Sequence, residues 1–387
     1  MESSNLNDCV MGNNINKREI LESGNNKYFL INEVFYSDYT STYTGKKIQI
    51  YQDKINEENK TPLLIKFISR DFLKKNIFSE LELKDDRLEK LFESLKNEFP
   101  KYQSLKHEGL QNLIDFIVNE KGIYFILEFF NFTLNDYIKM NIDQIKNTKT
   151  SIELHLTGFR ELITDFFACV NYIHEKGLYF GSLINPNDIY LKASKNSESK
   201  KKYFIKITHP FLSYIFTLLE LKSNLMENKF PMNFPPDIYQ IVKKRKTDNF
   251  ESLNSILSSL DTSFDIWTSG ILLYQMINDK IPFNYDSLDN IDKSNNIDNY
   301  YYELFPWKIS YELLVLITCC LRYNKNDRIQ KFYLNQIINE IKKGNENQNK
   351  LYHDLKIRLD VMTKEKYPAR FNLFESNQAE KYKKKDI

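Results

Sequence analysis

The sequence is poor in the residues that mark several protein classes. Of 387 residues only 10 are glycine and 4 are cysteine, and the net charge is +2. The cysteines, two of them adjacent at Cys319 and Cys320, have neither the even spacing of a disulfide framework nor the C-x-x-C pairs of zinc sites. So small a net charge gives no strong field that would attract nucleic acid or an anionic membrane. The composition therefore predicts a protein of a reducing compartment without zinc.

Long apolar runs are also missing. No stretch approaches the roughly 18 uncharged apolar residues of a membrane helix, and the N-terminal residues lack the apolar core of a signal peptide. Because 42% of the residues are apolar, the chain can still bury a sizeable core. We therefore expect a globular cytoplasmic protein with no membrane partner.

The sequence predicts a β-rich half followed by an α-rich half. After a polar leader over 1–27, expected to be disordered, β-branched and aromatic runs over 28–130 predict five antiparallel strands and one helix. Apolar residues at helical spacing dominate 131–343, with polar loop insertions. A C-terminal extension over 344–387 combines helical spacing with a basic tail. This extension is either an extra helix that docks on the preceding region or a partner-binding helix.

One long motif carries a family resemblance. The stretch Ser263 to Phe283, SFDIWTSGILLYQMINDKIPF, resembles the D-x-W-S-x-G-x-x-L-Y-E-M-x-x-G-x-x-P-F segment of eukaryotic protein kinases in length and residue type. Together with the order of predicted elements, the resemblance covers roughly Tyr28 to Lys343. It implies an α+β, bilobal protein kinase-like fold. The small lobe would be a five-stranded antiparallel β lobe with one helix, and the larger lobe mainly α-helical.

The resemblance assigns structural roles to four residues. Asp265 would hold the backbone of the catalytic loop, and Trp267 would pack beneath the activation segment. The string LRYNKNDRI resembles a second kinase motif, in which Arg328 would pair with the acid that ends the activation segment, here Asp237 of FPPD. These matches imply that the parts that hold the fold together are present.

The catalytic-loop motif is degenerate. The string YFGSLINPND, Tyr179 to Asp188, aligns with H-R-D-L-K-P-E-N and places Ser182 at the catalytic aspartate. A hydroxyl with a pKa far above neutrality cannot accept a substrate proton as a carboxylate does. Asp188 falls at the metal-binding asparagine, with one extra residue before it. The resemblance therefore implies that the catalytic base is missing.

The motif that holds magnesium in kinases is also changed. The string KYFIKITHPFLSY aligns with the strand and D-F-G turn and places His209 at the metal-binding aspartate. Imidazole is a poor ligand for a hard, oxygen-seeking cation. A zinc ligand or a base is the alternative role for His209, but no cysteine, histidine or acid at metal spacing accompanies it. We therefore interpret His209 as a structural histidine and expect no metal.

Of the positions that would bind the nucleotide, some match the kinase pattern and others do not. Lys66 aligns with the lysine that steadies the α and β phosphates, and Glu98 aligns with its helix partner. Leu64 stands where kinases have a small alanine, and Leu127 aligns with the gatekeeper. A leucine adds volume to a slot sized for a purine. We therefore interpret Lys66 and Glu98 as a retained ion pair that ties the small lobe together at a vestigial nucleotide site.

The loop that covers the phosphates in kinases has no glycine here. Kinases have G-x-G-x-x-G because only glycine lets the backbone approach the phosphates closely. The string VFYSDYTSTY places Phe35, Ser37 and Thr40 at the glycine positions and Thr42 at a valine. Side chains there would crowd the phosphates, and Asp38 would repel them. An ordinary hairpin explains this stretch.

The changed motifs predict a catalytically inactive protein kinase, a pseudokinase, that acts as a scaffold or allosteric binding partner in signalling. Its partners would be other proteins, such as an active kinase or a signalling complex. No cofactor is expected, since ATP and Mg²⁺ belong to the alternative, an active or weakly active atypical Ser/Thr protein kinase. Nucleic-acid binding through VKKRKT, Val242 to Thr247, is not favoured because acids nearby balance the short basic runs.

The segment that follows the altered D-F-G turn is unusually apolar. It reads LSYIFTLLELKSNLMENKF over 212–230, with few charged residues. The sequence leaves two alternatives for it: a docking strip for a partner, or a plug packed over the inactive catalytic region.

Overall fold

The fold is described from a computed structural model of the chain. The residues that the structure describes are 20–23, 26–36, 41–51, 54–57, 62–77, 85–140, 152–194, 203–226, 233–244, 256–278, 281–282, 316–317, 319–329 and 334–335. The chain divides into two compact units. The first unit comprises Met1–Lys75, Lys84–Gln103 and Asn112–Phe129; the second comprises Asn76–Leu83, Ser104–Gln111 and Phe130–Ile387.

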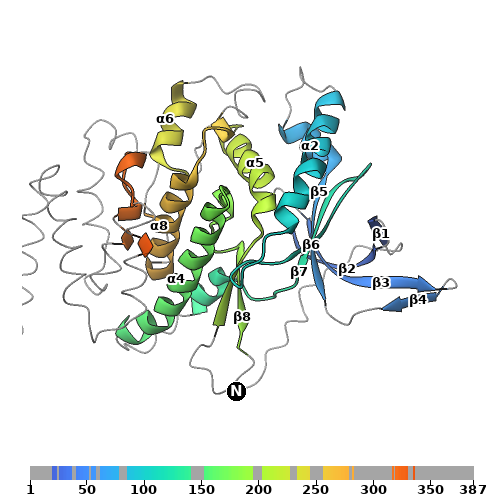
Figure 1. The fold of residues 1–387 in the computed structure, drawn as a ribbon, viewed down its shortest axis with the longest axis horizontal. Coiled ribbons are helices and arrows are strands. Elements are labelled where there is room, and N and C mark those ends of the chain that lie inside the picture. Colours follow the sequence, from blue (N-terminus) through green and yellow to red (C-terminus); the bar gives the residue numbers. More distant parts are fainter. Residues whose placement is uncertain are drawn as a thin grey trace, which may run out of the picture. The chain divides into compact units, whose positions relative to one another are not determined.

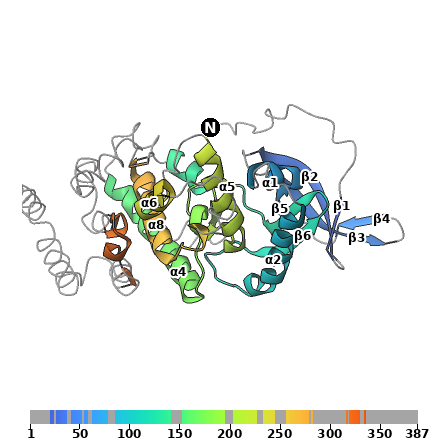
Figure 2. The same ribbon diagram turned by 90° about the horizontal axis from the view of Figure 1, so that it is seen from above.

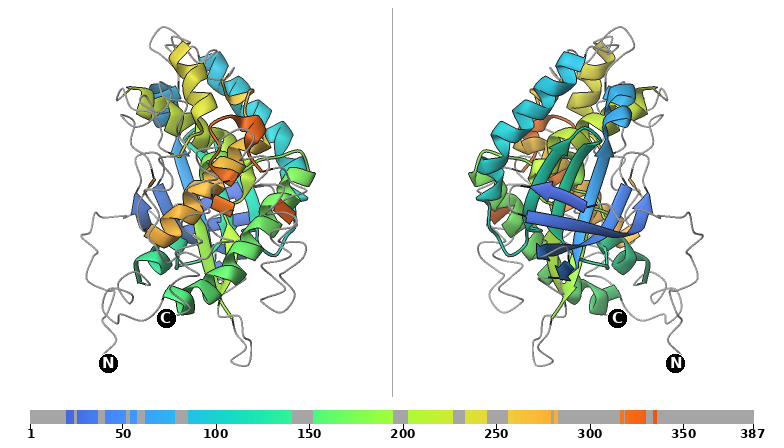
Figure 3. Two further views of the ribbon diagram at one scale, coloured as in Figure 1. Left: turned by 90° about the vertical axis from the view of Figure 1, so that its left-hand side faces the viewer. Right: turned by 90° about the vertical axis from the view of Figure 1, so that its right-hand side faces the viewer.

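The first unit contains an antiparallel sheet (Figure 1). Its strand order is β1-β2-β3-β5-β7-β6, and β4 pairs with β3 off this path. The strands are β1 (Ile20–Ser23), β2 (Asn26–Tyr36), β3 (Ser41–Tyr51), β4 (Lys54–Glu57), β5 (Leu63–Ser69), β6 (Leu113–Asn119) and β7 (Gly122–Glu128). The right panel of Figure 3 shows the strands of this sheet in front.

The predicted count of five strands is not confirmed, because the sheet has seven. The five predicted runs do form strands, and β1 and β4 are the additions. Two helices, α1 (Arg70–Ile77) and α2 (Asp85–Gln103), follow β5, where the sequence predicted one. The prediction that the whole leader is disordered is wrong for β1, because Leu21 is buried in the core.

The alternation of β5 sorts its side chains onto two faces of the sheet. Leu63 and Ile65 belong to a buried apolar cluster on one face, whose members are Leu21, Tyr28, Leu63, Ile65, Ile117, Tyr124 and Ile126. Lys66 lies on the other face, opposite Phe125 of β7. The ring of Phe125 lies 5.4 Å from that of Phe116, which in turn lies 5.5 Å from Phe99 of α2. Helix α2 therefore packs on the face that carries Lys66.

A buried carboxylate fastens β1 and β2 to the opposite edge of the sheet. Asp115 of β6 accepts hydrogen bonds from Ser23 Oγ at 3.0 Å, Asn26 Nδ2 at 3.3 Å and Tyr28 Oη at 2.8 Å. Burial, together with this hydrogen bond to Asp115, raises the pKa of Tyr28 well above its usual range. Because a buried carboxylate needs such donors, the end of the polar leader is part of the folded first unit.

The second unit is mainly helical. Among the described residues, its elements include α4 (Ile152–Glu175), η2 (Gly181–Leu183), β8 (Ile189–Ala193), β9 (Tyr203–Ile207), η3 (Pro210–Leu212), α5 (Ser213–Met226), α6 (Pro236–Lys244), α8 (Thr262–Asn278) and η4 (Lys325–Asp327). Helices α4 and α8 lie side by side (Figures 1 and 2). Helix α4 buries the predicted apolar stripe of Phe166, Phe167, Val170 and Ile173. None of the described helices combines the length and apolarity that crossing a membrane requires.

Some predictions fall on parts of the chain that the structure does not describe. Ser37, Asp38 and Thr40 lie outside the described residues, as do residues 1–19 and the C-terminal extension 344–387. The strands on either side of the glycine-free loop do pair as a hairpin, with Phe35 opposite Thr42.

Candidate functional site

Asp265 organises residues 179–188, which align with the kinase catalytic loop. This segment is the loop 179–188. The side chain is fully buried at the start of α8. Its Oδ2 accepts from the Phe180 amide and its Oδ1 from the Gly181 amide, both at 2.8 Å. His174 Nε2, at the end of α4, lies 2.9 Å from Oδ2. The carboxylate thus fixes the backbone of the loop, as the resemblance implied for this residue.

Gly181 allows α5 to lie against the loop 179–188. Its φ of 55° is left-handed, a conformation that residues with a Cβ rarely adopt. A Cβ at this position would lie 2.6 Å from Thr217 Oγ1 and 2.7 Å from Ser213 Oγ. The close approach of α5 therefore requires a glycine at position 181.

Thr217 of α5 hydrogen-bonds both the backbone amide and the hydroxyl of Ser182. Thr217 Oγ1 accepts from the Ser182 amide at 3.1 Å and lies 3.2 Å from Ser182 Oγ. One turn earlier, Ser213 Oγ donates to the carbonyl of Phe180 at 2.8 Å. Ser182, at the position of the catalytic aspartate, is buried and 4% exposed. Over 212–226, the apolar segment is thus packed on the loop, as the plug alternative expects and the exposed docking strip does not.

A carboxylate that the sequence analysis missed lies beside Ser182. Glu220, one turn after Thr217 on α5, forms side-chain hydrogen bonds with Ser182 and Asn233. The pKa of Glu220 is raised to about 7: burial is the largest cause, the negative charge of Asp188 adds to it, and the hydrogen bonds with Asn233 and Ser182 oppose it. The spacing of Ser213, Thr217 and Glu220 at i, i+4 and i+7 places them on one face of α5. This spacing is the feature of the sequence by which Glu220 could have been predicted to lie beside the loop 179–188.

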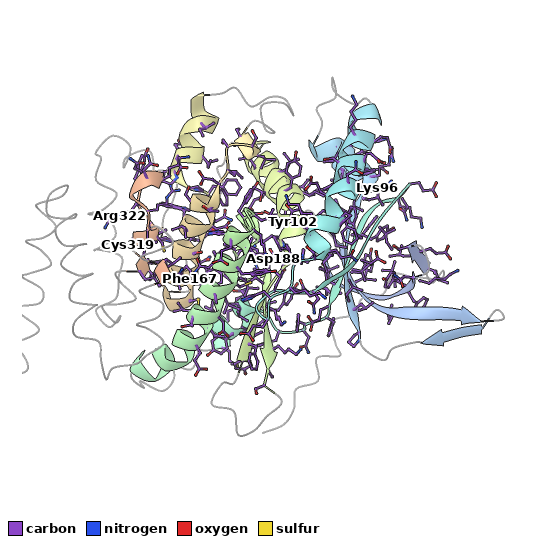
Figure 4. All side chains as sticks on the ribbon, in the orientation of Figure 1. Lys96, Tyr102, Phe167, Asp188, Cys319 and Arg322 are labelled. Carbon is purple, nitrogen blue, oxygen red and sulfur yellow. The ribbon has the colours of Figure 1, made fainter. Side chains whose placement is uncertain are left out.

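Asp188, labelled in Figure 4, is held by hydrogen bonds within its own loop. Asn185 Nδ2 donates both to a carboxylate oxygen of Asp188 and, at 2.9 Å, to the carbonyl of Ser182. Asn185 Oδ1 accepts from the amides of Asn187 and Asp188. The loop with its extra residue is therefore shaped by Asn185. In the part of the chain that the structure describes, no three His, Cys, Asp or Glu side chains converge as a metal site requires.

His209, at the position of the metal-binding aspartate, caps a short helix. Its side chain is almost fully buried, and its Nδ1 accepts from the amide of Phe211 at 3.3 Å. Pro210 begins η3 directly after it, where a missing N–H costs nothing. The imidazole thus satisfies a backbone donor of its own turn, an arrangement in keeping with a structural histidine.

In the first unit, apolar side chains fill the position next to Lys66. Leu64 and Leu127 are cross-strand partners on β5 and β7, and both are buried. Lys66 is 5% exposed and lies opposite Thr42 of β3. A purine-sized slot at this position would require Leu64 to move, since close-packed side chains do not yield volume freely.

The predicted ion pair between Lys66 and Glu98 is wrong. Glu98 lies on the solvent side of α2 with 54% of its side chain exposed, and its carboxylate lies 3.8 Å from Lys101 Nζ. Helix α2 turns Leu91 and Leu95 toward the core instead. With more than half of its side chain exposed and its carboxylate beside Lys101, Glu98 does not pair with the buried Lys66.

Arg328 pairs with Asp237, and the pair lies against α8. The guanidinium, with a side chain 1% exposed, binds Asp237 and donates to the carbonyls of Ser263 at 3.2 Å and Arg322 at 3.1 Å. It also lies 5.3 Å from the ring centroid of the buried Trp267. The residues to which the resemblance gave structural roles thus gather around one buried helix.

Comparison with solved structures finds a protein of similar fold. The crystal structure of Rad53 1-466 in complex with AMP-PNP matches with a TM-score of 0.50 at 16% identity. The match covers 81% of this chain, and 64% of the Rad53 chain. No protein-family profile matches the sequence. At this low identity, a structural match is evidence for the fold alone. The match shows that the chain has a protein kinase-like fold.

Proposed function

We propose that the protein is a pseudokinase: a kinase-like module that binds partners as a scaffold or allosteric regulator in signalling and does not transfer phosphate. The observation that carries this proposal is the contact of α5 with the loop 179–188. Ser182 stands where kinases have the base, and Thr217 engages both its amide and its hydroxyl. A buried hydroxyl held in this way cannot take a proton from a substrate.

The other altered positions point in the same direction. Catalysis of phosphoryl transfer consists mainly of positioning the reactants and neutralising charge. Here His209 bonds its own turn, and Glu98 pairs with Lys101 rather than with Lys66. The metal-binding aspartate and the lysine–glutamate ion pair of a kinase therefore have no counterpart at these positions. ATP and Mg²⁺ are accordingly not proposed as ligands.

Other proteins are the proposed partners, with an active kinase or a signalling complex as the favoured kind. The support is the fold itself together with the loss of catalytic residues. A reducing compartment such as the cytoplasm is the proposed location. Cys169, Cys319 and Cys320 are free and buried, as expected where disulfides do not form.

Glu220 favours one second candidate, a weakly active atypical Ser/Thr protein kinase that binds ATP. Its carboxylate hydrogen-bonds Ser182, so an acid lies next to the position of the kinase base. Its pKa of about 7 is near the value at which a general base works best at neutral pH. Under this candidate, Glu220 would take the proton of a substrate hydroxyl.

Phosphate transfer from γ-labelled ATP distinguishes the two candidates. For a pseudokinase, we expect the wild-type chain with Mg²⁺ or Mn²⁺ to label itself and generic protein substrates no faster than a heat-denatured sample does. Glu220→Gln should leave this background unchanged. The second candidate instead requires measurable transfer that Glu220→Gln lowers by about 10²-fold or more, the usual contribution of a general base. Glu161→Gln, an exposed acid on α4, is the matched control and should have no effect.

A further inference from the structure

Asp115 of β6 is a buried carboxylate that is surrounded by neutral donors. The residue is 6% exposed. Its oxygens accept hydrogen bonds from the side chains of Ser23, Asn26 and Tyr28, and from the backbone amide of Phe116 at 2.8 Å. All four donors are neutral, and across the described residues no lysine, arginine or histidine forms an ion pair with Asp115. The carboxylate is therefore stabilised by hydrogen bonds alone.

Strand β1 joins the sheet through few contacts. It has four residues and, among the described strands, pairs with β2 alone. Leu21 is its only buried side chain and belongs to the apolar cluster that includes Ile117 of β6. Ser23, partly exposed at the end of the strand, donates from its Oγ to Asp115 at 3.0 Å and so ties β1 to β6. Because a short edge strand opens locally at a low free-energy cost, this bond contributes a large share of its attachment.

A negative charge on Ser23 would have no positive partner. The carboxylate of Asp115 lies 3.0 Å from Ser23 Oγ, and the neighbouring Lys27 is paired with Glu22 at 2.6 Å. A phosphate on Ser23 would carry a charge of roughly −1.5 to −2 at pH 7. It would also remove the hydrogen that the hydroxyl donates. Phosphorylation would therefore replace an attractive contact with repulsion between two anions in a partly buried site, where screening is weak.

We propose that Ser23 is a phosphorylation site and that its modification detaches β1 from Asp115. The donor is ATP and the catalyst is a separate Ser/Thr protein kinase. The Ser23 oxygen forms a bond to the γ-phosphorus and gives its proton to the base of that kinase, while the bond between the β- and γ-phosphates breaks and ADP leaves. Partial exposure of Ser23 and local opening of β1 give the enzyme access to the hydroxyl. Because the site lies within the first unit, it holds for the pseudokinase and for the weakly active candidate alike.

Charged and neutral variants of Ser23 test the effect of a negative charge on β1. Hydrogen exchange of the β1 and β2 amides in the full chain, expressed as protection factors, measures the attachment. Ser23→Glu should lower protection in β1 by about tenfold or more relative to Ser23→Gln, which has the same shape without the charge, because like charges in contact repel strongly. In an Asp115→Asn background most of this difference should disappear. Amides of α4, in the second unit, serve as the internal reference and should not change.

Mass spectrometry tests whether Ser23 carries phosphate in the cell. Trypsin cleaves after Arg18 and Lys27, and the resulting peptide 19–27 contains Ser23 as its single hydroxyl-bearing residue. In protein purified from its native cells with phosphatase inhibitors, we expect both the unmodified peptide and a form heavier by one phosphoryl group. Treatment of the sample with a Ser/Thr phosphatase should convert the second form into the first.

Three results would overturn the proposal. The first is equal protection of β1 in Ser23→Glu and Ser23→Gln. The second is a difference between them that persists in the Asp115→Asn background, since charge repulsion is then not its cause. The third is detection of the unmodified peptide 19–27 alone. If proteins with Asp115→Asn do not fold, Ser23→Lys replaces that arm: a positive charge beside Asp115 should give at least the protection of Ser23→Gln, and protection as low as that of Ser23→Glu contradicts charge repulsion.

Discussion

Replacing Asp265 with alanine should cost about 3–5 kcal/mol of unfolding free energy, the range for breaking a buried charged contact. The side chain is fully buried and accepts from the amides of Phe180 and Gly181. Alanine would leave both donors unsatisfied inside the second unit, and each such buried group costs about 1–3 kcal/mol. Urea unfolding followed by the fluorescence of the buried Trp267 measures this loss.

Two variants separate the hydrogen bonds of Asp265 from general damage. Asp265→Asn keeps the volume and one acceptor but turns an NH₂ group toward a donor, so its loss should be smaller than that of alanine. Glu161→Ala, on the exposed surface of α4, should change stability by less than about 0.5 kcal/mol. An Asp265→Ala protein within about 1 kcal/mol of wild type would show that the loop does not depend on this carboxylate.

The pair of Arg328 and Asp237 should show strong coupling in a double-mutant cycle. Asp237→Ala leaves a guanidinium buried without its carboxylate, which typically costs about 3–5 kcal/mol. Arg328→Met also loses the donors to the carbonyls of Ser263 and Arg322, so a similar cost is expected. Because the double variant no longer holds an unpaired buried charge, its cost should be about 1–3 kcal/mol less than the sum of the two.

Denaturant unfolding of the four proteins measures this coupling. Arg328→Lys is the informative control, because a lysine keeps the charge but has no planar fork for Asp237 and the two carbonyls. It should recover only part of the lost stability. Additive costs for Asp237→Ala and Arg328→Met would mean that the buried ion pair contributes nothing beyond its separate residues.

Sequence patterns predicted most of the regular elements and the structural residues around α8. Short β-branched and aromatic runs, separated by turn-prone polar residues, identified β2, β3, β5, β6 and β7. The missed strands β1 and β4 have four residues each, too few for a clear period. Strand β1 also depends on a distant partner, since Ser23 bonds Asp115, 92 residues away. Local pattern cannot record such a contact.

The candidate site was predictable only in part, because it too depends on contacts between residues far apart in the sequence. The alignment of Ser182 and His209 with the kinase aspartates stays a prediction, since only the residue types at these positions are read directly from the sequence. The alignment could not indicate that Glu220 lies beside Ser182, because that proximity depends on how α5 packs on the loop 179–188. The Lys66–Glu98 pair failed because spacing along the chain does not fix which way a helix faces. Glu98 turned out to lie on the exposed side of α2.

We propose above all that this kinase-like fold does not bind nucleotide and magnesium. A thermal-shift titration of the full chain with ATP and Mg²⁺ tests it most directly, because a ligand that binds the native state must raise its stability, by about 2.7 kcal/mol at a hundredfold excess over Kd. With Leu64 buried beside Lys66 and His209 bonded to its own turn, we expect no saturable rise in Tm. A Tm that rises and saturates with ATP, and does so only when the metal is present, would contradict the claim.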